Sequence, residues 1–354
     1  MSDLPSFILC HPLARIVVKT RSEVVEKQLR TRLEPYVQIH SGSTDPSDEE
    51  ERPDLVVIAS TAAAALPPGP SIEVMIRDDQ QFERYRRPAD LWTLPQEHVM
   101  HERKNASVFR WSTEGPANVA VANSDEAALA KSVRRLVQDF IRLRAWHLGG
   151  IIVEASTISV EGLGLLAVGG RGTGKTTLLA RFLEIGAGMV SNDEVALFPG
   201  EGGITAHGFP MLVNTRPPLI ESFPQLRGLA NFTLEGRDPK APVRYNAFAH
   251  ALGGHIEADV SRLVGVLLTP DLEGARDVDP GAFSSALMAN ILSGPGWHSP
   301  WRLLPPGFPE PDLVELKRRV ARIVDEVPAI TVGRLHTPAN IADAAQARLT
   351  PQVA

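Results

Sequence analysis

The 354-residue sequence predicts an α/β protein in which a C-terminal α/β domain follows a smaller, mixed α+β N-terminal domain. Three observations lead to this fold class. From Ile151 onward, short apolar runs typical of strands alternate with helical patterns. At residues 169–176, a glycine-rich segment lies between an apolar run and a helical pattern. The first third of the chain consists instead of short β-branched runs bounded by Pro, Gly or Asp, which are typical of strands.

Composition and charge exclude several classes of protein. Hydrophobic residues make up 43% and charged residues 22%, as in ordinary globular proteins, so the chain is not expected to be disordered, collagen-like or a coiled coil. The single cysteine, Cys10, excludes an internal disulfide framework and a multi-cysteine zinc site. The net charge of −6 and the lack of a basic stripe predict no nucleic-acid partner.

No apolar run reaches the roughly 18–20 residues that a membrane span needs. The first residues also lack the basic stretch and the long apolar stretch of a signal peptide. We therefore expect a cytoplasmic protein with no membrane partner.

Residues 1–122 are predicted to form the N-terminal domain. Strands are expected at 15–19, 54–58, 71–76, 107–111 and 118–121, and a short helix over 22–33, where apolar residues recur at helical spacing. This region contains no catalytic motif. Recognition of an acceptor substrate and formation of a homo-oligomer both stay open as its role.

A connecting helix is predicted over residues 123–150. Ser124 is a suitable N-cap, and the negative charges of Asp125 and Glu126 in the first turn interact favourably with the positive end of the helix dipole. Gly149 and Gly150 would end the helix, and the domain boundary is placed there.

Residues 151–350 are predicted to form the C-terminal domain. Strands are expected at 151–153, 157–160, 164–168, 189–190, 263–268 and 329–332, and helices at 177–185 and 313–324. The run at 263–268 is apolar throughout, which is typical of a central strand covered on both faces.

The glycine-rich segment matches the pattern G-x-x-x-x-G-K-[ST] of a P-loop, with a strand before it and a helix after it. Glycines allow the backbone to curl so that successive N–H groups point at phosphate oxygens, and the helix that follows presents its positive end. Lys175 can reach the β- and γ-phosphates, and the Thr176 hydroxyl can ligate Mg²⁺. We therefore predict ATP and Mg²⁺ as cofactors. The predicted nucleotide-binding residues are Gly169, Gly170, Arg171, Gly172, Thr173, Gly174, Lys175, Thr176 and Thr177.

A polar cluster, residues 191–194, ends the next predicted strand. An acidic residue at the tip of a strand beside a P-loop is suited to a second Mg²⁺ contact. Asp193 is the candidate for that contact.

Over residues 153–193 the sequence resembles the C-terminal kinase domain of the HPr kinase/phosphorylase family and aligns with its pattern without gaps. That family carries a P-loop, a helix, and then a strand ending in two adjacent aspartates. The resemblance implies an HPr-kinase-like P-loop fold, with Lys175 and Thr176 at the P-loop lysine and hydroxyl and Asp193 at the second, metal-holding aspartate. The resemblance is weaker through about residue 332 and absent from the N-terminal region.

Two departures from the family pattern affect catalysis. Asn192 stands where the resemblance implies the aspartate that acts as general base and acid, and an amide cannot take up that proton. Glu154 stands at the family's upstream histidine. Either Glu154 or Glu194 replaces the base, or the loose transition state of phosphoryl transfer needs no strong base.

Two later segments are candidates for completing the site. Arg216, or alternatively Arg227 in a faint match to a second family signature, could neutralise the transferred phosphate, because a guanidinium binds phosphate oxygens bidentately. Trp297 and Trp301 lie in a Pro/Gly-rich stretch that either packs against the domain or forms a substrate lid.

The leading hypothesis is an ATP- and Mg²⁺-dependent phosphotransferase that moves the γ-phosphate of ATP to a hydroxyl. The acceptor would be a serine of a peptide or protein, or a small molecule. The predicted catalytic residues are Lys175, Asp193, Glu154, Asn192 and Arg216. Two alternatives stay open: a catalytically retired ATP-binding regulator or scaffold, which Asn192 favours, and a simple NTP hydrolase.

Overall fold

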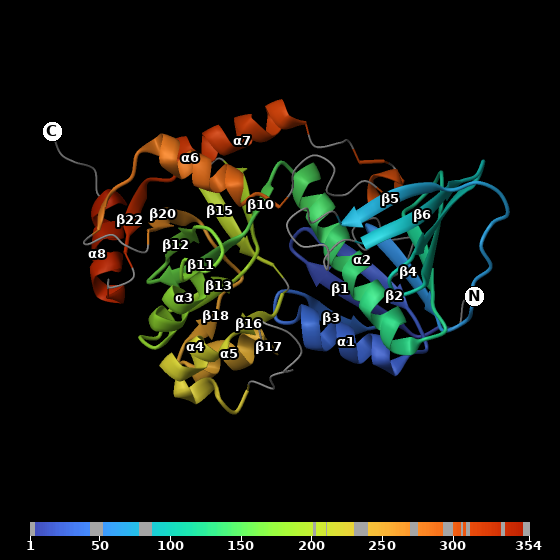
Figure 1. Cartoon of the computed structure of the whole chain (residues 1–354), viewed down its shortest axis with the longest axis horizontal. Helices are drawn as coiled ribbons and strands as arrows, with labels where there is room; N and C mark the ends of the chain where they lie inside the picture. The colour runs from blue at the N-terminus through green and yellow to red at the C-terminus, as the bar shows by residue number, and fades with distance from the viewer. Residues whose placement is uncertain are drawn as a thin grey trace. The chain divides into compact units, whose positions relative to one another are not determined.

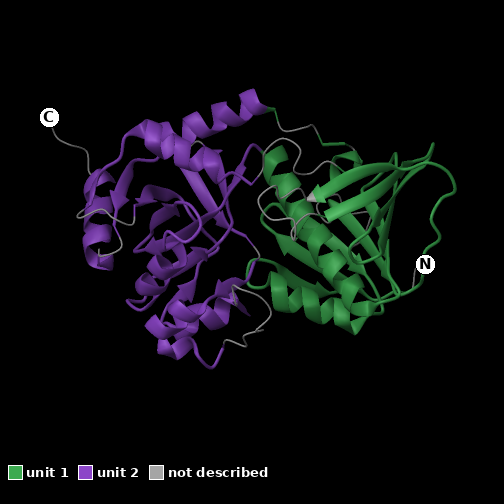
Figure 2. Cartoon of the chain, in the orientation of Figure 1, with its two compact units in different colours: residues 1–148, 294–312 green, residues 149–293, 313–354 purple. Residues whose placement is uncertain are grey.

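The computed structural model describes residues 4–42, 52–77, 87–200, 203–209, 211–229, 240–269, 275–292, 300–305, 307–308, 312–333 and 337–349 (Figure 1). The chain divides into two compact units (Figure 2). Unit 1 contains residues 1–148 and 294–312, and unit 2 contains residues 149–293 and 313–354. The fold is mixed α/β, and this part of the predicted fold class is confirmed.

The division differs in two ways from the predicted domains. The predicted connecting helix belongs to unit 1, and so does the segment 294–312, which the sequence places in the C-terminal domain. Packing explains the second difference. The Trp301 side chain is 1% exposed, with its ring 5.1 Å from that of Phe109 and 5.7 Å from that of Trp111. Trp301 therefore packs in the core of unit 1, whereas Trp297 lies outside the described residues.

Unit 1 contains a nine-stranded sheet in the order β3-β1-β2-β4-β9-β8-β7-β6-β5. Strand β4 pairs in parallel with β2 and β9, and the other neighbouring pairs are antiparallel. The strands are β1 (Ser6–His11), β2 (Ala14–Lys19), β3 (Gln38–Ser41), β4 (Leu55–Ser60), β5 (Ile72–Arg77), β6 (Arg87–Thr93), β7 (Glu97–Glu102), β8 (Ser107–Ser112) and β9 (Asn118–Ala122).

Two helices of unit 1, α1 (Glu23–Leu33) and α2 (Glu126–His147), pack against each other, and α2 also contacts β2, β4, β8 and β9 (Figure 1). The N-cap of α2 is Asp125, whose carboxylate accepts hydrogen bonds from the N–H groups of Ala127 and Ala128. The expected cap, Ser124, lies one residue too early. A short 3-10 helix, η4 (Trp301–Leu303), contacts α2.

A buried network of charges joins β6 and β7 to α2. The Arg87 guanidinium donates two hydrogen bonds to the fully buried Glu102 carboxylate, at 2.9 and 3.0 Å. From α2, Arg135 lies 3.4 Å from Glu102, and Asp139 lies 3.6 Å from Arg87. Burial raises the pKa of Glu102, but the hydrogen bonds and charge of Arg87 outweigh it, so that pKa lies below its ordinary value.

We expect Arg87→Met to destabilise the protein by about 3–5 kcal/mol, because it leaves the Glu102 carboxylate buried without its main partner. The double variant Arg87→Met/Glu102→Met removes both charges and should recover part of the loss. Urea unfolding monitored by circular dichroism measures the effect. Arg103→Met is the matched control, since Arg103 pairs with Asp90 and Glu73 while exposed. Equal losses in Arg87→Met and Arg103→Met would contradict this account.

Unit 2 contains a seven-stranded sheet in the order β18-β13-β11-β12-β20-β22-β21. Strand β20 pairs in parallel with β12 and β22, and β11 pairs antiparallel with both β12 and β13. The strands of this sheet are β11 (Ala155–Val160), β12 (Leu163–Val168), β13 (Gly188–Ser191), β18 (His255–Ile256), β20 (Arg262–Leu268), β21 (Arg276–Asp277) and β22 (Ala329–Val332).

Two smaller sheets accompany it, one in the order β10-β14-β15-β19 and one formed by β16 and β17. Their strands are β10 (Ile151–Val153), β14 (Val195–Gly200), β15 (Gly203–Gly208), β16 (Val213–Thr215), β17 (Ala241–Val243) and β19 (Asp259–Val260). The helices of unit 2 are α3 (Lys175–Leu183), α4 (Pro217–Ser222), α5 (Tyr245–Ala251), α6 (Pro280–Ala289), α7 (Leu313–Glu326), α8 (Pro338–Leu349) and the 3-10 helix η3 (Pro224–Leu226).

The core of unit 2 lies around its central strands. Every residue of β12 is buried, and α3 contacts β11, β13 and α8. Across the described ranges of both units, no helix combines the length and apolar character needed to cross a membrane.

Candidate active site

The glycine-rich loop, residues 169–174, joins β12 to α3. Gly172 and Gly174 have φ angles of +84° and +105°, a region that side-chain-bearing residues rarely adopt, and Gly174 is the N-cap of α3. The Thr173 hydroxyl donates a hydrogen bond of 2.8 Å to the Gly170 carbonyl. A β-carbon at Gly169 would lie 2.8 Å from the Thr173 hydroxyl oxygen, so the tight curl requires glycine there.

Lys175 is the first residue of α3, and its side chain turns back over the loop. Its Nζ donates hydrogen bonds to the carbonyls of Gly169 at 2.6 Å and Gly170 at 3.3 Å. The same Nζ lies 3.3 Å from the Glu154 carboxylate. Lys175 is only 8% exposed, so its ammonium group is held within the loop by these three oxygens.

Sheet register brings Glu154 to the loop. Ala155 of β11 pairs with Val168 of β12, so the residues next to this pair, Glu154 and Gly169, lie at the same end of the two strands. The Glu154 N–H donates to the carbonyl of Asn290, just after α6, at 2.7 Å. The Glu154 side chain is 41% exposed, so its carboxylate can be reached from solvent.

The polar cluster after β13, residues 191–194, lies at the same end of these strands, because Ser191 pairs with Thr157 of β11. Burial, and then the negative charges of Glu154 and Glu194, raise the pKa of Asp193 to about 6. The Asn214 amide, from β16, donates to the Asp193 carboxylate at 3.5 Å. Carboxylates from three positions therefore influence one another beside the Lys175 ammonium.

Asn192 is held by its backbone, while its side chain has no partner among the described residues. Its carbonyl accepts a 2.6 Å hydrogen bond from the Ser156 hydroxyl, and its N–H donates to the Tyr245 hydroxyl oxygen at 3.3 Å. The residue is 1% exposed, and both amide atoms, Nδ2 and Oδ1, are buried. A buried, unsatisfied amide costs about 1–3 kcal/mol per group.

The other predicted site residues lie on neighbouring segments. Thr176 and Thr177 are half-buried in the first turn of α3, and Arg171 is exposed at the tip of the loop. Arg216 is the N-cap of α4, two residues after the Asn214 that contacts Asp193. Arg227 is exposed after η3. The roles predicted for these residues stay predictions.

Sequence reasoning missed Tyr245, and it gave no role to Asn214, which lies in the segment 213–217 that was a candidate for completing the site. Tyr245 begins α5, is fully buried, and has a pKa raised by burial and then by the charge of Asp193. Asn214 lies on the short strand β16. Neither residue belongs to a local motif, and both reach the cluster at Asn192 and Asp193 only through the fold.

No family model matches the sequence, and no curated protein matches it. Among solved structures, the chain is similar to the Hpr(Ser) kinase/phosphatase from Coxiella burnetii. The TM-score is 0.23 and the sequence identity 12%, over 36% of this chain and 71% of that chain. The likeness is weak.

Proposed function

We propose that the chain is an ATP- and Mg²⁺-dependent phosphotransferase, built on an HPr-kinase-like P-loop domain, that transfers the γ-phosphate of ATP to a hydroxyl. The acceptor is a serine of a peptide or protein, or a small molecule. One observation carries the proposal: the buried ammonium of Lys175 lies in a glycine-rich loop at a strand-to-helix junction, 3.3 Å from the Glu154 carboxylate.

Phosphate binding is supported by the loop itself. A helix N-terminus presents unpaired N–H groups and the positive end of its dipole to an anion. Lys175 would exchange its contacts with the Gly169 and Gly170 carbonyls for phosphate oxygens. Residues 169–177 would surround the phosphates, and Arg216 is proposed to neutralise charge on the transferred group.

The residues present fit a Mg²⁺ ion. Mg²⁺ takes oxygen ligands, and it is commonly held by one or two protein groups together with substrate phosphates. The half-buried Asp193 carboxylate, crowded by the charges of Glu154 and Glu194, would be stabilised by a cation, and Thr176 would supply a hydroxyl. No group of three or more metal-ligating side chains occurs in the described part of the chain, and binding of this kind does not need one.

Exposure favours Glu154 over Glu194 as the group that takes the acceptor's proton. The Glu154 carboxylate is 41% exposed beside Lys175, whereas Glu194 is only 6% exposed. A general base must come within hydrogen-bond reach of the hydroxyl that it deprotonates. An acceptor arriving from solvent could reach the exposed Glu154 carboxylate more readily than the buried Glu194.

Glu154→Gln should lower kcat by at least about 10²-fold, the usual scale for loss of a general base, with little change in the Kd of ATP. The matched control is Glu161→Gln, which alters an exposed glutamate at the opposite end of the β11–β12 hairpin. Single-turnover kinetics at saturating ATP measures the effect. An unchanged kcat in Glu154→Gln would remove Glu154 from the reaction.

The overall test is a transfer assay with γ-labelled ATP and Mg²⁺, in which the purified protein is mixed with extract from its own source and products are separated by mass. A labelled peptide or metabolite, absent with Lys175→Ala, supports the phosphotransferase. Label found only as free phosphate would instead identify an NTP hydrolase.

The second candidate is an ATP-binding regulator that transfers nothing, and Asn192 favours it. The buried Asn192 amide cannot act as a base at the position where the resemblance implies one. Bound ATP recovered intact after prolonged incubation with extract would support this candidate.

A further inference from the structure

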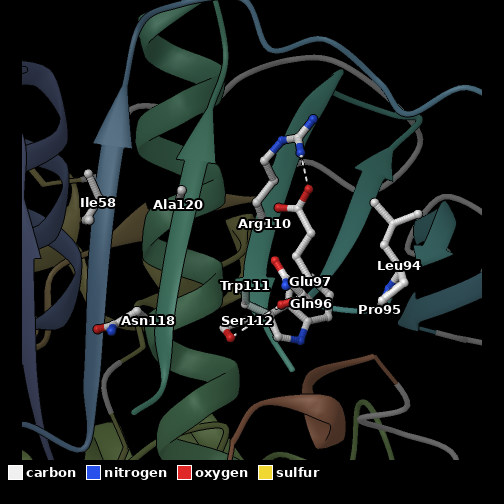
Figure 3. Close-up of a pocket in the computed structure, with 10 residues that line it drawn as sticks. All are labelled: Ile58, Leu94, Pro95, Gln96, Glu97, Arg110, Trp111, Ser112, Asn118 and Ala120. Atoms are coloured by element: carbon white, nitrogen blue, oxygen red, sulfur yellow. Dashed lines mark hydrogen bonds and ion pairs between the residues drawn. The ribbon is translucent and has the colours of Figure 1, made fainter. Parts of the chain in front are cut away.

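Unit 1 contains a cavity of about 720 Å³, within the usual range of ligand-binding sites (Figure 3). None of the residues discussed for the candidate active site lines it. The lining comes from strands β4, β7, β8 and β9 and from the turn before β7: Ile58, Leu94, Pro95, Gln96, Glu97, Arg110, Trp111, Ser112, Asn118 and Ala120.

The floor of the cavity is on the sheet face opposite α2. Ser107 of β8 contacts Ser132 of α2 through their hydroxyls at 2.9 Å, so the alternating side chain of Arg110 lies on the other face. Ala120 pairs in register with Arg110 on one side and with Ile58 on the other. The small Ala120 side chain therefore leaves a notch between the aliphatic Ile58 and the Arg110 guanidinium.

The Arg110 guanidinium is oriented by its ion pair with Glu97, which also lines the cavity. Arg110 donates a hydrogen bond of 2.7 Å to the Glu97 carboxylate (Figure 3). It donates another, of 2.5 Å, to the Ala65 carbonyl. These contacts use two of the five N–H groups of the guanidinium, and its planar fork suits a carboxylate. Because Arg110 is already oriented, less conformational entropy is lost when it binds an anion.

The remaining lining combines apolar and amide groups. Leu94 packs against the buried cluster of Trp92, Val99 and Val108. The side-chain amides of Gln96 and Asn118 are exposed at the cavity. Amides of this kind can donate to and accept from a peptide backbone.

We propose that this cavity binds a short extended peptide segment that places an aliphatic side chain in the notch at Ala120 and a carboxylate on Arg110. A small aliphatic acid would leave the side-chain amides of Gln96 and Asn118 without a hydrogen-bond partner, whereas a peptide backbone can bond to both. That this peptide belongs to the phosphoryl acceptor rests on the proposed function.

The test uses fluorescent tetrapeptides and the full-length protein, with binding measured by anisotropy. Three probes contain leucine. The first ends in a free C-terminal carboxylate directly after the leucine, the second is the same peptide with a C-terminal amide, and the third has aspartate after the leucine and a C-terminal amide. Serine replaces leucine in a parallel set. We expect leucine to bind at least about tenfold more tightly than serine, the usual scale for filling an apolar pocket.

Ala120→Ile fills the notch with a residue that favours strands and should weaken binding of the leucine probes at least about tenfold. Ala122→Ile is the matched control, because Ala122 lies two residues further along β9, on the same face and outside the cavity lining. Thermal unfolding confirms that both variants fold. Equal binding by Ala120→Ile and Ala122→Ile, or no preference for leucine, would overturn the proposal.

Arg110→Gln tests the carboxylate separately. In the wild-type protein, either the free C-terminus or the aspartate probe should bind more tightly than the amide, and whichever does so identifies the source of the carboxylate. In Arg110→Gln that preference should disappear while the leucine preference remains. A carboxylate preference that survives Arg110→Gln would overturn this assignment.

The peptide site and the phosphotransferase can fail independently. Lys175→Ala should bind the leucine probes with unchanged affinity, and Ala120→Ile should bind ATP with unchanged affinity. Peptide binding without any phosphoryl transfer would leave the cavity assignment standing and reject the proposed function. Transfer to a peptide acceptor with a KM that Ala120→Ile does not change would reject the docking role of the cavity.

Discussion

Lys175→Ala is expected to abolish Mg²⁺-ATP turnover, with a loss of at least about 10²–10³-fold, the scale for removing one preorganised group that stabilises developing charge. The physical reason is burial. The Lys175 ammonium is 8% exposed and held by the Gly169 and Gly170 carbonyls, so its charge is already oriented before phosphate arrives. Removing it also takes the Lys175 donor away from the Gly169 carbonyl, whereas the Gly170 carbonyl keeps its hydrogen bond from the Thr173 hydroxyl.

The measurement is release or transfer of γ-phosphate, together with the Kd of ATP from isothermal titration calorimetry. Lys317→Ala is the matched control, because Lys317 is an exposed lysine on α7 of the same unit. We expect its turnover and ATP affinity to equal those of the wild-type protein. Full activity in Lys175→Ala would reject the assignment of the glycine-rich loop as the phosphate site.

Asp193→Asn is expected to have opposite effects on activity and stability. Turnover should fall to background, because an amide is a weaker Mg²⁺ ligand than a carboxylate. In EDTA without nucleotide, the same variant should raise the free energy of unfolding at pH 7 by on the order of 1–3 kcal/mol. The reason is that burial, and then repulsion by Glu154 and Glu194, makes the Asp193 charge unfavourable in the folded protein.

The direction of the pH effect follows from the pKa of Asp193, which rises from an ordinary value of 3.8 to about 6 on folding. Between these values the folded state binds the proton more tightly, so the wild-type protein loses stability as the pH rises from about 4 to 6. Above pH 6 the loss is complete. The advantage of Asp193→Asn should therefore shrink by on the order of 1–2 kcal/mol as the pH falls from 7 to 4.5.

Urea unfolding at several pH values measures this difference. Asp325→Asn, at an exposed position on α7, is the matched control and should show no such pH dependence. Added Mg²⁺ should stabilise the wild-type protein at pH 7 and not Asp193→Asn. A stability difference that does not change with pH would show that Asp193 carries no buried, repelled charge.

Local patterns are sufficient to predict the elements around the glycine-rich loop. The apolar run of β12, the glycines that follow it and the amphipathic pattern of α3 are adjacent in the sequence, and each depends on near neighbours alone. The same holds for α2, whose apolar residues recur at helical spacing. The N-cap of α2 is Asp125 and not the predicted Ser124. Both side chains are suitable caps, and only the path of the backbone decides between them.

Strands β6 and β7 show why other elements could not be predicted. Each mixes charged and apolar residues, and Pro88 lies within β6. The Arg87–Glu102 pair joins the two strands, and Arg135 and Asp139 of α2 lie beside it. A charged side chain can be buried in the core when an oppositely charged side chain is buried beside it, and the tertiary fold decides which residue that is.

Local sequence patterns are enough to predict the strand, glycine loop and helix that carry Lys175, and the polar end of β13 that carries Asp193. The contact of Glu154 with Lys175, and the contacts of Tyr245 and Asn214 with the cluster after β13, come from the folded arrangement of distant segments. The tertiary structure also decided that Trp301 belongs to unit 1 and that Ala120 lies between Ile58 and Arg110. These contacts depend on strand register and on packing between distant segments, which no local pattern encodes.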